Sequence, residues 1–164
     1  MVKVLLVYES KYGNTKLVAE TIAEGIKEAS DNHTAIYELK EIVLKQPPDF
    51  DVVLIGSPNH LGRPTGGIKK FINELGRLEV KGKYAAVFDT YMAKDFEKAV
   101  KKMEKQIVEK APGLTLAAPG LSIRVDGMKG PIFPLTTPGF SEMPISADEL
   151  PKCKEFGVNI ATRL

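Results

Sequence analysis

The side chains best suited to chemistry lie in the polar turn at residues 10–15. Ser10, Asn14 and Thr15 carry uncharged hydrogen-bond donors and follow an apolar run at residues 4–7. A helical pattern of apolar residues starts within the same turn. A helix N-terminus attracts anions because it presents unpaired N–H groups and the positive end of the helix dipole. The turn therefore predicts a phosphate site, and an ordinary helix start with Asn14 or Thr15 as N-cap is the alternative.

Two common nucleotide-binding signatures are missing from the sequence. No Gly-x-Gly-x-x-Gly pattern follows the first apolar run, which argues against a dinucleotide site of Rossmann type. The nearest approach to a P-loop is residues 62–67, but Ile68 stands where that motif needs lysine. The remaining interpretation is a single terminal phosphate held at residues 10–15 by N–H and O–H groups.

Length, charge and cysteine content restrict the class of protein. A chain of 164 residues suits one domain with one core, here residues 1–164. The net charge of +2, from 23 basic and 21 acidic residues, argues against general nucleic-acid binding. No apolar run approaches the roughly 20 residues of a membrane helix, and no signal peptide precedes the first strand. Because Cys153 is the single cysteine and cannot form an internal disulfide, we expect a cytoplasmic protein.

Apolar periodicity predicts strands and helices in alternation. We expect strands at residues 2–7, 34–39, 51–57, 84–88 and 114–125, the last one broken near Pro119. We expect helices from Asn14 or Thr15, over 67–75, over 95–109 with Phe96 facing inward, and at the C-terminus. Alternation predicts a doubly wound α/β fold, and strands that are apolar on both faces predict a parallel sheet covered on both sides.

The last helix has two alternative starts. Ser146 and Glu149 have the spacing of a capping box, but Pro151 would then fall on the second turn. Asp148 as the N-cap places Pro151 in the first turn, where its missing N–H costs nothing. We therefore favour Asp148.

Ligands of doubly wound sheets bind beyond the carboxyl ends of the strands. This rule selects three loops, at residues 8–15, 57–66 and 89–94. A further segment at about 126–145 is rich in proline and glycine. A loop of this length is either a surface connection or a functional element.

Residues 6–15 closely resemble the phosphate loop of flavodoxins and of the flavodoxin domains in flavodiiron proteins. They share its pattern of two apolar residues, an aromatic, Ser or Thr, a small residue and a final Thr. Residues 56–62 are similar to the loop that flanks the flavin ring in flavodoxins and related quinone reductases, and residues 88–92 lie where the other ring loop is expected. The resemblance covers residues 1–125 and the last helix. It implies a single flavodoxin-like domain, a three-layer sandwich around a five-stranded parallel sheet.

The resemblance also implies FMN as the cofactor. The residues that would hold its phosphate are Ser10, Lys11, Tyr12, Gly13, Asn14 and Thr15. The residues that would line one side of the isoalloxazine ring are Pro58, Asn59, His60, Leu61 and Gly62, and those on the other side are Asp89, Thr90 and Tyr91.

Two residues of the ring loops have a second interpretation. Gly62 permits the backbone change that the family uses to bond flavin N5, but it is also a plain turn glycine before Pro64. His60 either lies near the flavin and tunes it or is a surface histidine.

Three functions follow from these observations. The first is an FMN-binding electron carrier that works with redox protein partners, with neither nucleic acid nor membrane involved and with no catalytic side chain. The second is an NAD(P)H-dependent quinone or FMN reductase on the same fold. The third is a non-redox interaction module that has lost the flavin.

Overall fold

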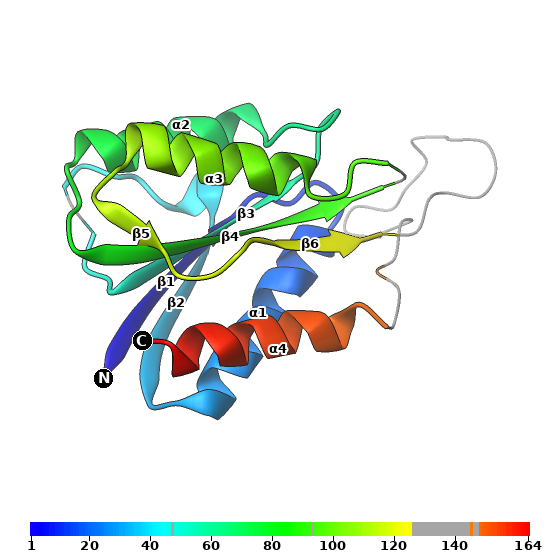
Figure 1. Cartoon of the computed structure of the whole chain (residues 1–164), viewed down its shortest axis with the longest axis horizontal. Coiled ribbons are helices and arrows are strands. Elements are labelled where there is room, and N and C mark those ends of the chain that lie inside the picture. Colours follow the sequence, from blue (N-terminus) through cyan, green and yellow to red (C-terminus); the bar gives the residue numbers. More distant parts are fainter. Residues whose placement is uncertain (47, 93, 126–144, 146–147) are drawn as a thin grey trace.

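The fold is a parallel sheet between two layers of helices (Figure 1). The computed structural model describes residues 1–46, 48–92, 94–125, 145 and 148–164. The strands are β1 (Val2–Tyr8), β2 (Asn32–Glu38), β3 (Val52–Pro58), β4 (Lys83–Tyr91), β5 (Leu114–Leu116) and β6 (Leu121–Arg124). The helices are α1 (Asn14–Ala29), α2 (Gly66–Arg77), α3 (Lys98–Lys110) and α4 (Leu150–Thr162), with a short 3₁₀ turn η1 (Leu39–Glu41).

The strand order is β2-β1-β3-β4-β5, with β6 also pairing with β4, and all these pairs are parallel. The predicted fifth strand is broken as expected: β5 pairs with the start of β4 and β6 with its end. The register places Ser57 on β3 and Ser122 on β6 on either side of Asp89. The doubly wound α/β fold predicted from the sequence is confirmed.

Each face of the sheet is covered by one pair of helices (Figure 1). α1 and α4 bury one apolar cluster that includes Leu6, while α2 and α3 bury another that includes Leu5 and Val7. Neighbouring residues of β1 therefore point into different cores, which explains why this strand is apolar on both faces.

Two glycines bring α1 and α4 into close contact. A Cβ atom on Gly25 would lie 2.1 Å from the carbonyl oxygen of Lys154, and one on Gly157 would lie 2.1 Å from that of Ile22. Any larger residue would force the helices apart. This packing fixes α1, which begins at the polar turn, against the most C-terminal helix.

Among the boundaries that differ from the sequence-based expectation, those of α3, β4 and α4 have a clear structural reason. α3 begins at Lys98 rather than at residue 95, so Phe96 lies outside the helix, 54% exposed, and its ring packs against Tyr91 with centroids 5.2 Å apart. β4 continues to Tyr91 because β6 pairs with its last residues. α4 begins at Leu150 after Glu149, one residue later than Asp148 as N-cap would place it, with Pro151 in the first turn as expected.

Some expectations fall on residues outside the described part of the chain. Ser146 is one of them, and so is the Pro/Gly-rich segment except Ile145, which bridges to Val125. The described residues contain no helix that is long and apolar enough to cross a membrane.

Candidate functional site

A cavity of about 730 Å³ opens beyond the carboxyl ends of β1, β3 and β4. It is lined by most of the residues predicted for the site: Ser10, Lys11, Tyr12, Asn14, Thr15, Pro58, Asn59, His60, Leu61, Thr90 and Tyr91. The structure thus brings all three predicted loops together around one space. The three predicted residues outside this lining are Gly13, Gly62 and Asp89, and each has a different position.

The end of the cavity formed by residues 10–15 is built mainly from backbone. Gly13 precedes α1 with φ 92°, so it is the N-cap, and because it has no side chain it cannot cap the helix itself. The alternative of Asn14 or Thr15 as N-cap is therefore wrong, because both are already helical and buried. The N-terminus of α1 lies at this end of the cavity, since Asn14 and Thr15 both line it.

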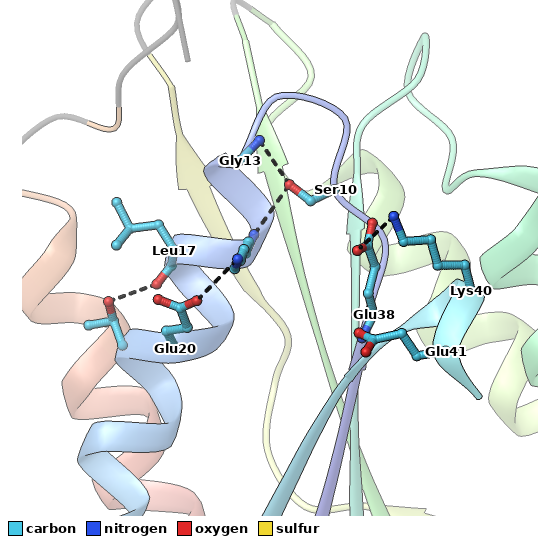
Figure 2. A network of polar contacts seen from close by, with 9 residues as sticks. Ser10, Gly13, Leu17, Glu20, Glu38, Lys40 and Glu41 are labelled. Carbon is cyan, nitrogen blue, oxygen red and sulfur yellow. Dashed lines mark hydrogen bonds and ion pairs between the residues drawn. The ribbon is translucent and has the colours of Figure 1, made fainter. Parts of the chain in front are cut away.

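Ser10 organises this turn through its hydroxyl oxygen. The oxygen accepts a hydrogen bond from the Gly13 N–H at 3.0 Å and another from the Lys16 N–H at 3.4 Å (Figure 2). Neither bond uses the hydroxyl proton of Ser10, which can be donated to an anion. The two N–H groups thus fix the position of the Ser10 oxygen and leave its hydroxyl proton available as a donor.

Thr15 connects the turn to the end of β4. Its Oγ1 lies 3.1 Å from Oγ1 of Thr90, and both side chains are buried. The cavity mouth beside the turn is cationic and aromatic, since the Lys11 ammonium lies 5.4 Å from the centre of the Tyr12 ring. An anion at this turn would meet neutral donors inside and Lys11 at the rim.

The loop after β3 is a tight turn. His60 and Arg63 exchange backbone hydrogen bonds of 2.7 and 3.1 Å, and Leu61 and Gly62 between them both have positive φ, 54° and 78°. This pattern fits a type I′ turn, which favours glycine or asparagine at both centres. Leu61 is nonetheless 87% exposed at the cavity mouth. Gly62 is buried and lies outside the lining. His60 is an exposed residue of the lining, and a role in tuning a flavin stays a prediction.

The end of β4 contributes Thr90 and Tyr91 to the cavity, but Asp89 lies beneath it and is fully buried. Its carboxylate accepts three hydrogen bonds, from Ser122 Oγ at 2.5 Å, Asn59 Nδ2 at 2.9 Å and the Val100 N–H at 3.0 Å. Burial raises the pKa of Asp89 to about 6, although these three bonds oppose the shift. Asp89 joins the cavity wall to α3 and β6.

The lining also contains residues that sequence reasoning missed. They are Glu9, Glu38, Lys40, Thr65, Met92, Asp95 and Val125. Glu38 is the last residue of β2 and Lys40 lies two residues further on, with their charged groups 3.5 Å apart (Figure 2). The strand-end rule applied to β2 would have found both. Thr65 precedes α2 and caps it by accepting a bond from the Ile68 N–H, a pattern typical of helix starts.

Two other chemistries find little support in the described residues. Among them, no group of three His, Cys, Asp or Glu side chains is placed to hold a metal ion. Cys153 is fully buried, as its place on an apolar helical stripe predicts, and burial raises the pKa of its thiol to about 12. Such a thiol is unreactive at neutral pH.

The sequence and the fold are both similar to known flavodoxins. A flavodoxin domain model matches residues 5–124. A flavodoxin of Aquifex aeolicus (strain VF5) is 32% identical over 93 residues, which are 55% of this chain and 50% of that protein. The chain thus spans about half the length of the curated relatives it matches.

Solved structures agree on the fold. An archaeal flavodoxin superimposes with a TM-score of 0.75 at 23% identity, over 98% of this chain and 97% of that one. The Flv1 flavodiiron core from Synechocystis sp. PCC6803 superimposes with a TM-score of 0.69 at 18% identity, over 98% of this chain and 35% of that one.

Proposed function

This chain belongs to the flavodoxin family, and we propose that it is an electron-transfer protein whose FMN occupies the cavity described above. FMN is the cofactor of flavodoxins, and electron transfer to redox partners is their function. The observation that carries the proposal is the start of α1, where a turn shaped by Gly13 and Ser10 brings the helix N-terminus to the cavity. A helix N-terminus that opens onto a cavity favours the binding of an anion such as a phosphate.

The chemistry of the cavity fits FMN. Its volume of about 730 Å³ is within the usual range of about 300–1,000 Å³ for small-molecule sites. Neutral donors and a helix N-terminus at one end suit a terminal phosphate. At the other end the lining is apolar and aromatic, with Pro58, Leu61 and Tyr91, which suits a flat ring.

At the phosphate end, Ser10 would donate its hydroxyl proton to the phosphate while its oxygen holds the turn in shape. Thr15 and the first-turn N–H groups would complete the anion site, and Lys11 would add positive charge at the rim. Gly13 would act through its φ of 92° rather than through contact. These roles require the backbone geometry of the turn more than any single side chain.

At the ring end, the loop at residues 58–62 would cover one side of the ring and Thr90 with Tyr91 the other. When bound, FMN supplies one- and two-electron redox chemistry. The protein residues would orient the ring and shield it from water, and the exposed Leu61 would mark the side that redox partners can approach. Asp89 would support this wall from beneath.

The test is reconstitution with FMN, followed by visible absorption and a redox titration. We expect a stoichiometric yellow complex that is reduced in resolved steps. The proposal would be overturned by a folded protein that binds no FMN on titration. Steady oxidation of NAD(P)H by the complex with a quinone would instead identify a reductase.

We further propose that the partners are redox proteins that approach the cavity mouth. Exposed apolar side chains are grouped there, including Leu61, Tyr12 and Met92, and all three line the cavity. The buried free thiol of Cys153 supports a reducing compartment such as the cytoplasm. Fractionation of cells that produce the protein at native levels tests the location.

A further inference from the structure

One polar atom of a cavity-lining residue has no hydrogen-bond partner in the part of the chain that the structure describes. Asn59 lines the cavity, and its Nδ2 donates a hydrogen bond to Asp89. Its Oδ1 is buried and has no hydrogen-bond partner among the described residues. Buried amide oxygens are almost always hydrogen-bonded, so an unpartnered one in a cavity wall points to a donor on a ligand.

The orientation of the Asn59 amide is set by Asp89. An ionised carboxylate only accepts hydrogen bonds, so the NH₂ group must face Asp89 and the oxygen must face elsewhere. Asp89 is itself fixed by bonds from β6 and from the first turn of α3, through Ser122 Oγ and the Val100 N–H. The amide is therefore held by a network that spans four elements.

The charge on Asp89 depends on pH near neutrality. The groups that face its carboxylate are Ser122, Val100 and Asn59 through hydrogen bonds and Glu97 through its negative charge. Burial and Glu97 raise the pKa of Asp89 and the hydrogen bonds lower it, with the result near 6. A proton on Oδ1 can be accepted by the Ser122 hydroxyl, and the bond to Asn59 then loses its charge assistance.

Resting on the proposed function, we propose that Asn59 Oδ1 accepts a hydrogen bond from the ring N–H of bound FMN, and that Asp89 is the positioning residue that holds the amide for it. The oxidised isoalloxazine ring carries a single N–H group, at N3, so the donor is defined by chemistry. The ionised carboxylate also polarises the amide and makes Oδ1 a stronger acceptor.

The first experiment compares FMN with FMN methylated at N3, both oxidised, by fluorescence titration at pH 8. We expect wild type to bind FMN at least about 10-fold more tightly, as the loss of one hydrogen bond to a buried acceptor predicts. In Asn59→Ala the two ligands should differ by about 2-fold or less. If methylation at N3 weakens binding equally in wild type and in Asn59→Ala, Asn59 does not accept a hydrogen bond from N3. Asn59→Ser provides the same comparison should the alanine variant fail to fold.

The second experiment measures the preference for FMN over its methylated form between pH 5 and pH 8. We expect the preference in wild type to fall as the pH falls through about 6. In Asp89→Asn it should be weaker at pH 8 and independent of pH, because a neutral amide cannot fix the orientation of Asn59 through charge.

Ser122→Ala is the matched control, since Ser122 contacts Asp89 but does not line the cavity. Loss of its hydrogen bond should move the midpoint of the pH profile upward while the full preference is kept at high pH. A merely structural role for Asp89 would leave the midpoint in place, and a wild-type preference that is independent of pH would overturn the role of Asp89.

The outcomes separate this inference from the proposed function. A folded wild type that does not bind FMN at pH 8 defeats both. A wild type that binds FMN, but with a preference that Asn59→Ala does not change, defeats only the inference.

Discussion

The two ends of the cavity are built in different ways. The phosphate end uses consecutive residues, 10–15, held by one short-range network around Ser10. The ring end uses Asn59, Asp89 and Ser122, which are 30 and 33 residues apart in sequence and meet only through the sheet register. The first end is therefore a local structure, and the second is a product of the whole fold.

The largest effect that should separate the two ends is the pH dependence of stability. The pKa of Asp89 rises from 3.8 to about 6 on folding, so folding favours its neutral form. That contribution is complete below pH 3.8 and is lost as the pH rises through 6, which amounts to about 3 kcal/mol. Urea unfolding of wild type and Asp89→Asn from pH 4 to pH 7 should show this slope in wild type alone. Parallel curves would show that the carboxylate is not buried as described.

The phosphate end should affect one part of the ligand only. In the double variant Ser10→Ala/Thr15→Ala, we expect FMN binding to weaken about 100-fold, because two hydrogen bonds to a charged group are lost. Riboflavin, which lacks the phosphate, should bind almost as it does to wild type. Asn59→Ala is the control from the opposite end and should weaken both ligands. Equal losses of FMN and riboflavin in the double variant would place the phosphate elsewhere.

Substitutions at Gly13 test whether the phosphate end depends on the backbone conformation of its turn. Gly13 has φ 92°, and a Cβ atom there would meet nothing within 4 Å, so a substitution acts through backbone conformation alone. We expect Gly13→Ala to lower the free energy of unfolding by about 1–2 kcal/mol. Gly13→Asn should cost less, since asparagine tolerates positive φ. Chemical denaturation of the apoprotein measures both, and an equal loss would contradict the strain argument.

The smallest effect is a gain in stability at the ring end. Leu61 is 87% exposed with φ 54°, so replacing it removes strain without losing burial. Leu61→Asn should raise the free energy of unfolding by roughly 0.5–1 kcal/mol. Leu61→Val is the control with the opposite expected sign. It should lower the free energy of unfolding, because a β-branched residue tolerates positive φ less well than leucine does. A loss in the asparagine variant would mean that the exposed leucine has packing contacts in solution.

The same contrast explains how much of the molecule was predictable. The phosphate turn was found from residues 10–15 because its signals, an apolar run, polar donors and a helical pattern, are adjacent in sequence. The family resemblance predicts both Asp89 and Thr90 at the ring, and strand alternation alone does not say which of them faces a cavity. Only the pairing of β6 with β4, which supplies Ser122, turns Asp89 into a buried support.

The predictions that were wrong at the ends of elements have similar causes. Phe96 fits a helical stripe, but its ring packs on Tyr91 outside α3. Lys40 follows the end of β2, a fourth strand end that reaches the cavity and that the three predicted loops do not include. The fold class itself was predictable. Both faces of the central strands are apolar, and segments with the apolar periodicity of strands alternate with segments that have the periodicity of helices.

The glycine contact between α1 and α4 has a consequence for synthesis. Gly25 is synthesised early, whereas Gly157 is synthesised near the end of the described chain. Gly157 faces Ile22 across the interface of the two helices. Until then Ile22 and Ile26, which are fully buried in the finished core, lack the helix that covers them. A nascent chain halted before residue 150 should therefore expose an apolar surface and attract chaperones. It would also lack the support behind the helix that begins at the phosphate turn, so the cofactor site would be completed only after α4 has been synthesised.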